Sequence, residues 1–170
     1  TPTFWKFVLM NSMKLGVIKE LPSNNNSPSY IPYNDRFIMG GNGIPYGNVL
    51  RGYDDNRVGP LTSTGNPIGG NTLVKFSTEF RVPFAENPVV YGMVFAEMGN
   101  VWSSTDLMER LSLPRSGPLD LKRSVGVGVR FFMPMIGMLG FDFARGFDRV
   151  DINGKLKPEW KTTLTFGQQF

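Results

Sequence analysis

The stretch that decides the fold is Trp160-Lys-Thr-Thr-Leu-Thr-Phe-Gly-Gln-Gln-Phe170. Its even positions form a mostly apolar set, namely Trp160, Thr162, Leu164, Phe166, Gln168 and Phe170. Its odd positions are polar or small, namely Lys161, Thr163, Thr165, Gly167 and Gln169. Because successive side chains of a strand leave on opposite faces, this alternation predicts a β-strand with one apolar face.

The same stretch has the length and the face pattern of a strand that crosses a membrane. About ten residues of tilted strand span the hydrocarbon core of a bilayer. An outward apolar band flanked by aromatic residues, over a polar interior, is typical of transmembrane β-barrels. Phe170 ends the strand, an arrangement that resembles the C-terminal targeting signal of bacterial outer-membrane proteins. We expect Trp160, Leu164, Phe166 and Phe170 to form the signal of a terminal barrel strand.

The composition of the 170 residues suits a β-rich protein and disfavours several other classes. Hydrophobic residues make up 41% and charged residues 19%, and 20 glycines with 13 prolines indicate many turns. No apolar run of about eighteen residues occurs, so we expect no membrane-spanning helix. Cysteine and histidine are absent, which removes thiolate ligands and the commonest general base. We therefore expect no enzyme, no cofactor and no metal, and a net charge of +4 without a basic run predicts no nucleic-acid partner.

Turn residues divide the chain into six strand-like segments, which span residues 4–21, 72–83, 89–101, 121–133, 138–147 and 160–170. The connections alternate in length. Short turns are expected at 84–88 and 134–137, and long loops at 22–71, 102–120 and 148–159. Short turns at one end and long loops at the other are typical of outer-membrane barrels, with the turns in the periplasm. Helical periodicity is weak throughout, and we expect at most a short turn of helix at 106–113.

A soluble β-sandwich or a lipocalin-like barrel would also alternate apolar and polar residues. In such a protein the apolar face packs inward, and the connections need not alternate in length. Here the polar face is rich in glycine, serine and threonine rather than in lysine and glutamate. These features favour an all-β fold, a transmembrane antiparallel β-barrel, over the soluble alternatives.

The first long loop contains the motif Arg36-Phe-Ile-Met-Gly-Gly-Asn-Gly-Ile-Pro-Tyr-Gly-Asn-Val-Leu-Arg-Gly-Tyr-Asp-Asp-Asn-Arg-Val-Gly-Pro60. It resembles the F-x-x-G-G … V-R-G-F/Y … G-P loop of the barrel assembly factor BamA and its relatives. That superfamily includes surface antigens, two-partner secretion transporters and organelle import barrels. Further stretches resemble the family's next strands, namely Gly69-Gly-Asn-Thr-Leu-Val74 with Ser77-Thr-Glu-Phe-Arg-Val-Pro83, Val94-Phe-Ala-Glu-Met-Gly-Asn-Val-Trp102, and Arg123-Ser-Val-Gly-Val-Gly-Val129. Leu50 and Glu97 replace a usual valine and a usual aspartate, and both keep the chemistry.

The resemblance covers essentially the whole chain but only the C-terminal part of a family member. It implies that residues 1–170 supply the six C-terminal strands of a sixteen-strand barrel, with a reentrant loop at about 22–71 and without the family's periplasmic repeats. Six strands alone cannot enclose such a lumen, and an open sheet in lipid would leave two unpaired edges. We therefore expect the chain to be a piece of a longer protein or complex.

The resemblance also implies a set of site residues. In this family the loop folds back into the lumen, where its arginine contacts acidic residues of the wall. The matching positions are Arg51, Gly52 and Tyr53 in the loop, with Glu79 and Glu97 in the wall. Without the motif, Arg51 would be interpreted as an exposed loop arginine.

The alternation tests the two wall positions separately. Glu79 shares a polar face with Lys75 and Ser77, which supports a lumen position. The face of Glu97 is less clear, because it also carries the bulky residues Tyr91, Met93 and Phe95. A lumen face with such residues would pack against the returning loop. The loop carboxylates Asp54, Asp55, Asp106 and Asp151 are expected to be solvated.

The function implied by the resemblance is that of an outer-membrane β-barrel assembly factor, an insertase that works through a lateral seam at its terminal strand. Its partners would be unfolded outer-membrane proteins, periplasmic or lipoprotein assembly subunits and outer-membrane lipid, in the cell outer membrane of a Gram-negative-type bacterium. Gly167 either kinks the terminal strand and weakens closure or is a small lumen-facing residue. The alternatives are a polypeptide-secretion transporter of the same superfamily and a passive porin-like barrel.

Overall fold

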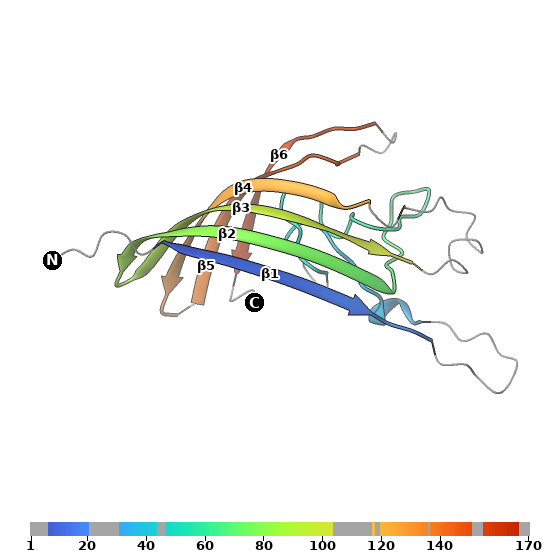
Figure 1. The fold of residues 1–170 in the computed structure, drawn as a ribbon, viewed down its shortest axis with the longest axis horizontal. Helices are drawn as coiled ribbons and strands as arrows, with labels where there is room; N and C mark the ends of the chain where they lie inside the picture. Colours follow the sequence, from blue (N-terminus) through green and yellow to red (C-terminus); the bar gives the residue numbers. More distant parts are fainter. Residues whose placement is uncertain are drawn as a thin grey trace, which may run out of the picture.

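The computed structural model describes residues 7–20, 31–43, 47–103, 117, 120–135, 137–150 and 155–166. Its six strands are β1 (Val8–Val17), β2 (Thr72–Glu86), β3 (Val89–Trp102), β4 (Lys122–Met133), β5 (Gly137–Gly146) and β6 (Trp160–Phe166). They form one sheet in chain order, and every neighbouring pair is antiparallel. The sheet is curved like part of a barrel wall (Figure 1). The predicted all-β antiparallel fold is confirmed.

The boundaries differ from the sequence expectation at the ends of two strands. The first segment was expected to continue to residue 21, but β1 ends at Val17, and the described residues 18–20 are not in a strand. The second difference is at the end of β2. We expected this strand to end at Pro83, but it continues to Glu86. The pairing with β3 shifts register between Pro83 and Ala85, and proline, which lacks an N–H donor, is tolerated at such a bulge. The first turn is therefore shorter than expected. A short 3-10 helix, η1 (Tyr33–Asp35), was not expected, whereas the turn of helix expected at 106–113 lies outside the described residues.

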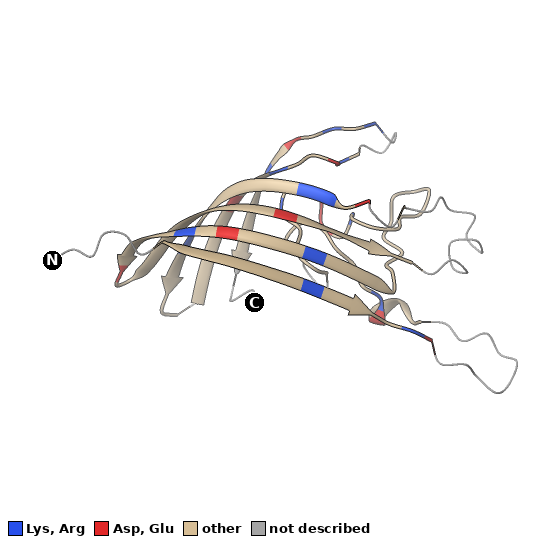
Figure 2. Cartoon of the chain, viewed as in Figure 1, with Lys and Arg blue, Asp and Glu red and all other residues tan. Residues whose placement is uncertain are grey.

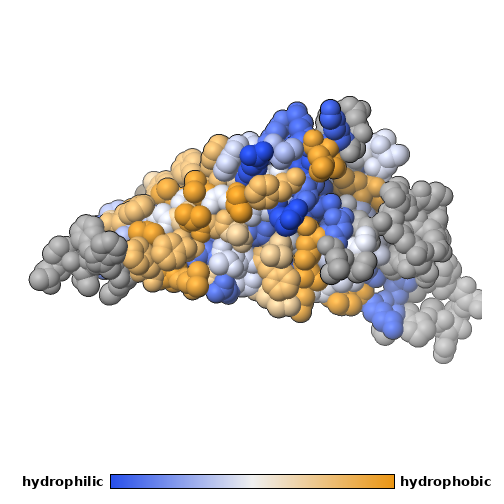
Figure 3. Space-filling model, turned by 45° about the horizontal axis from the view of Figure 1, so that its top comes forward, coloured by the Kyte–Doolittle hydropathy of each residue, from blue (hydrophilic) through white to orange (hydrophobic). Residues whose placement is uncertain are grey.

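The two faces of the sheet differ in the way the alternation predicts. Val127 on β4 and Phe141 on β5 are 50% and 49% exposed, whereas their neighbours Ser124 and Asp142 are buried. We call the face of Val127 and Phe141 the outer face, and the opposite one the inner face. Apolar side chains cover much of the visible surface (Figure 3). In a soluble sandwich these apolar residues would be the buried ones, so the exposure of the outer face favours contact with lipid.

The core lies on the inner face, where the described parts of the first long loop fold back against the strands (Figure 1). Its buried cluster joins four loop residues to one residue each from β2 and β3, and consists of Met39, Leu50, Tyr53, Val58, Leu73 and Val101. Phe37 packs against this cluster, and the loop also pairs with itself through isolated bridges such as Gly41–Leu50. The described parts of the loop are therefore packed against the inner face of the sheet.

Charged positions are isolated along the otherwise neutral strands (Figure 2). In the described part of the chain, no helix has the length and apolar character needed to cross a membrane.

Candidate functional site, a loop arginine held by wall carboxylates

The loop reaches the wall through a tight turn at Gly52. Its φ is +85°, a left-handed conformation that costs other residues about 1–2 kcal/mol. A Cβ at Gly52 would lie only 2.8 Å from the backbone nitrogen of Gly146 at the end of β5. Glycine is therefore required twice here, for the backbone angle and for the close approach to β5. On one side of this turn Arg51 is bonded to β2 and β3, and on the other side Tyr53 is bonded to residues at the ends of β4 and β5.

Arg51 is 4% exposed and is held by Glu79 and Glu97. Its Nη2 donates to Oε1 of Glu79 at 2.6 Å and to Oε1 of Glu97 at 2.8 Å. Its backbone N–H donates to Oε2 of Glu97 at 2.9 Å, so both carboxylate oxygens of Glu97 bind the same loop residue. Asp142 of β5 adds a third carboxylate, with Oδ1 at 3.7 Å from Nη1. The structure thus brings the loop arginine together with both expected wall residues and with one more.

Two of the bulky side chains that made the face of Glu97 unclear, Met93 and Phe95, contact the guanidinium of Arg51. The guanidinium carbon lies 3.5 Å from the ring centroid of Phe95, a cation–π contact. Its Nη1 lies 3.6 Å from the sulfur of Met93. Burial alone would lower the pKa of Arg51, but the charges of Glu97, Glu79 and Asp142 outweigh it and raise the pKa. Arg51 therefore keeps its charge, and the inner-face position of Glu97 is explained by packing against the loop.

Each of the three carboxylates also has a cation of its own on the wall. Arg81 binds Glu79 through Nε and Nη2, at 2.9 and 2.7 Å. Lys75 lies 3.1 Å from Glu97. The carboxylate of Asp142 is gripped by both Nη atoms of Arg130, at 2.8 and 2.7 Å. The three carboxylates of the wall are therefore balanced in charge by three cations of the wall. Arg51 adds one further positive charge to this cluster.

Sequence reasoning missed Asp142 and Arg130 as members of this cluster. The signal was present, because Asp142 lies between Gly140 and Ala144 on the polar face of its expected strand. What the sequence did not indicate was that β5 passes beneath the same point of the loop as β2 and β3. That proximity follows from the curvature of the sheet (Figure 1).

Tyr53 fixes the other side of the turn to the ends of β4 and β5. Its hydroxyl donates to the carbonyl oxygen of Arg123 at 2.7 Å and accepts from the backbone N–H of Asp148 at 3.3 Å. Burial raises the pKa of Tyr53, so the hydroxyl stays protonated and able to donate. Tyr53 thus acts as a buried polar anchor.

Asp54, expected to be solvated, is instead bound to the terminal strand. Lys161 of β6 donates to its Oδ1, and Arg149 lies 2.8 Å from its Oδ2. Arg149 also reaches Glu159 at 3.2 Å. Burial raises the pKa of Asp54, but the hydrogen bond and charge of Lys161, together with Arg149, lower it overall. The solvated interpretation is wrong for Asp54, because the reentrant loop carries it to the cations of β6 and the preceding connection.

The expected residues of the terminal strand are described only in part. Trp160 and Leu164 point to the outer face, and both are exposed. Trp160 stacks on Phe143 of β5 with ring centroids 4.6 Å apart. The structure describes β6 as far as Phe166, and Gly167 and Phe170 lie outside the described residues, so the signal and the kink stay predictions. Within the described ranges, no group of three or more Asp or Glu residues is placed to hold a metal ion.

A curved antiparallel wall whose inward loop is clamped by a buried arginine defines the class of barrel that the motifs indicated. Residues 2–170 match the family model described as the Omp85 superfamily domain. The chain therefore belongs to the Omp85 superfamily, a family of outer-membrane β-barrel proteins.

A solved structure supports this at the level of fold. It is described as the crystal structure of BamA from Haemophilus ducreyi lacking POTRA domains 1-3, and it matches with a TM-score of 0.65 at 20% identity. The match covers 94% of this chain and 32% of that one, so the present chain spans about a third of its length. The predicted resemblance to a BamA-like barrel portion is confirmed.

Proposed function

We propose that this chain is the C-terminal part of an outer-membrane β-barrel assembly factor of a Gram-negative-type bacterium, which folds and inserts other outer-membrane proteins. The observation that carries the proposal is the buried network between Arg51 and the wall residues Glu79, Glu97 and Asp142. A passive barrel would need only a wall around its pore. An insertase needs a stable section of wall beside a strand that can open.

In this role the work is done by hydrogen bonds and not by a covalent step. β6 lies at one edge of the described sheet, and a strand edge is a template for pairing with another chain. An incoming outer-membrane protein would add its strand at this edge, so that its backbone N–H and C=O groups never meet lipid unpaired. The partners in this proposal are unfolded outer-membrane proteins, assembly subunits of the periplasm and the outer-membrane lipid.

The test compares two arginines of the same loop in the full-length protein. Arg51→Ala removes the clamp, whereas Arg57→Ala removes an exposed arginine six residues further on. We expect Arg51→Ala to lower the amount of heat-modifiable, folded outer-membrane protein in cells that depend on the variant, and Arg57→Ala to leave it near the wild-type level. Normal assembly by Arg51→Ala, with hydrogen exchange showing the loop released, would contradict the proposal.

Two further measurements separate the alternatives. The native polypeptide should be much heavier than the 19.0 kDa of this chain, and a native mass at that value without a companion chain would contradict the proposal. Periplasmic assembly subunits should co-purify with the full-length protein. A single exported polypeptide trapped in the lumen would instead favour a secretion transporter of the same superfamily.

A further inference from the structure

The outer face of the sheet carries a charged side chain at only two of the described strand positions. Both are arginines, namely Arg123 at the start of β4 and Arg145 at the end of β5. Val125 is paired with Arg145, so the two arginines are diagonal neighbours on the same face. Both lie at the end of the sheet from which the long connections leave (Figure 1). The charge on the outer face is therefore of one sign and confined to one level.

The two arginines differ in their partners. Arg123 is bound by Asp148, whose carboxylate accepts from its backbone N–H and from Nε and Nη2, at 2.9, 3.1 and 3.0 Å. The side chain of Arg145 has no hydrogen bond or ion pair with any part of the chain that the structure describes, and its Nε is buried without an acceptor. A buried donor left without an acceptor is unfavourable. Among the described residues, the guanidinium of Arg145 is thus without a partner, whereas the neighbouring guanidinium of Arg123 is paired with Asp148.

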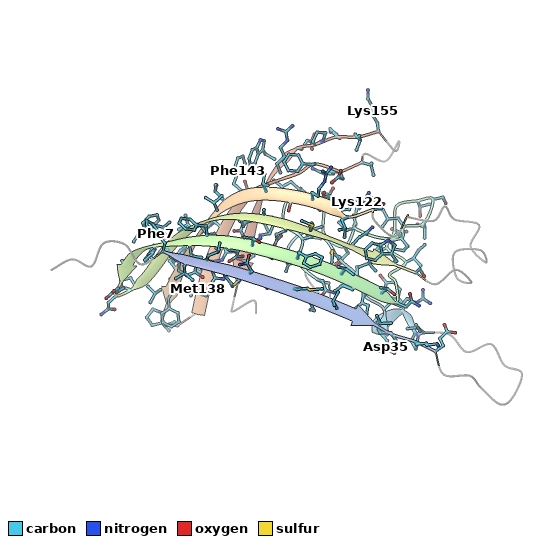
Figure 4. All side chains as sticks on the ribbon, viewed as in Figure 1. Phe7, Asp35, Lys122, Met138, Phe143 and Lys155 are labelled. Atoms are coloured by element: carbon cyan, nitrogen blue, oxygen red, sulfur yellow. The ribbon has the colours of Figure 1, made fainter. Side chains whose placement is uncertain are left out.

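The surroundings of Arg145 place it at the level of a membrane surface. Trp160 of β6 is paired with Arg145 and is 49% exposed. Its ring stacks on Phe143, which Figure 4 labels on the upper part of the wall. Tryptophan is enriched where hydrocarbon meets lipid head groups. Further from the long loops, the outer face of β4 and β5 continues with Val127, Val129 and Phe141, as a hydrocarbon-facing surface would.

We propose that Arg145, with Arg123 beside it, binds the phosphate group of a membrane lipid on the side of the long loops. A guanidinium offers two parallel N–H donors that match two oxygens of a phosphate. An outward arginine is strongly unfavourable at the middle of a bilayer but nearly neutral at its surface, where it reaches the head groups. Figure 3 shows hydrophilic side chains among the apolar ones on this side of the molecule. The ligand follows from charge: phosphate supplies the acceptors that Arg145 lacks.

The test measures lipid binding by the full-length protein in a neutral detergent, with native mass spectrometry as the readout. The probes are phosphatidic acid, diacylglycerol of the same acyl chains and inorganic phosphate. We expect phosphatidic acid to bind, diacylglycerol to bind more weakly, and inorganic phosphate at the same concentration to leave the bound lipid in place. Arg145→Gln should weaken phosphatidic acid binding about tenfold, the loss expected for a charge-assisted hydrogen-bonded contact.

The matched control is Lys155→Gln, which removes an exposed cation of the connection before β6, labelled in Figure 4. It should leave binding unchanged. Wild-type affinity for phosphatidic acid in Arg145→Gln would overturn the proposal, and equal displacement by inorganic phosphate would overturn the lipid as occupant. If Arg145→Gln does not fold, Arg145→Lys provides the test, because lysine keeps the positive charge but lacks the two parallel N–H donors of the guanidinium. Unchanged affinity in that variant would overturn the two-pronged contact.

This inference rests on the outer-membrane family and not on the insertase activity. Lipid binding is measured without an assembly assay, so either proposal can fail while the other stands.

Discussion

The wall beneath Arg51 and the terminal strand β6 are held to the same loop by contacts of different strength. β2 and β3 have 15 and 14 residues, and the loop is bonded to them through a buried arginine. β6, which the structure describes over Trp160–Phe166, is bonded to the loop through the partly exposed pair of Asp54 and Lys161. Breaking a buried ion pair that has several hydrogen bonds is strongly destabilising, whereas exposed ion pairs contribute little to stability. The difference suggests that the loop stabilises one section of wall firmly and the terminal strand only lightly.

The largest effect is expected at Glu97. Glu97→Ala leaves Arg51 without two of its three hydrogen bonds to carboxylates, leaves Lys75 without its carboxylate, and should raise the free energy of the docked loop by about 4 kcal/mol. Hydrogen exchange of the loop amides at 47–60 in the full-length protein measures this. Glu86→Ala, at an exposed end of β2, should change it by no more than about 0.5 kcal/mol. Equal effects of the two changes would show that the clamp adds nothing.

A smaller effect is expected at Gly52. Gly52→Ala imposes a left-handed conformation on alanine and pushes its Cβ into the backbone of β5, so loop docking should weaken by about 2–3 kcal/mol. The matched control is Gly65→Ala in the same loop. Its φ is +80°, but its Cβ would meet only the flexible guanidinium of Arg57 at 3.1 Å. The same exchange experiment should show a larger loss for Gly52, and an equal loss would mean that the close approach is unimportant.

The bond to β6 should have a small and local effect. Asp54→Asn removes the charge that Lys161 and Arg149 share and should weaken protection of β6 by about 0.5–1 kcal/mol. Protection of β2 and β3 should not change. Asp55→Asn is the control, because Asp55 accepts a bond from Asn42 within the loop. Loss of protection throughout the sheet would contradict the separation into two regions.

The smallest effect is expected from pH. The pKa of Asp54 lies below its ordinary value in the folded protein. The ionised carboxylate of Asp54 therefore stabilises the contact between the loop and β6 fully above about pH 4, and this stabilisation is lost as the pH falls through the lower, folded-state pKa. The pKa of Asp148 is also lowered, because its carboxylate accepts a hydrogen bond from Arg123. Protection of β6, corrected for intrinsic exchange, should therefore fall in acid. Asp54→Asn should show a shallower fall, and an identical pH profile would exclude Asp54 as the cause.

The sequence predicted the loop residues of the site better than it predicted their surroundings. Arg51, Glu79 and Glu97 were found by motif resemblance, and the alternation of β2 supported Glu79 on physical grounds. Asp142 and Arg130 were not found, because they come from strands far along the chain whose distance to the loop depends on the sheet as a whole. Asp54 was misjudged for the same reason, because its partner Lys161 is 107 residues away.

What the sequence alone determined was the strands and their two faces. Side-chain direction along a strand is a local property of the backbone, so a period of two in apolar residues is sufficient to assign it. The tertiary structure decided which charges meet. The curvature of the sheet and the left-handed turn at Gly52 set the position of Arg51 among Glu79, Glu97 and Asp142, and those are distances between residues that no local pattern encodes.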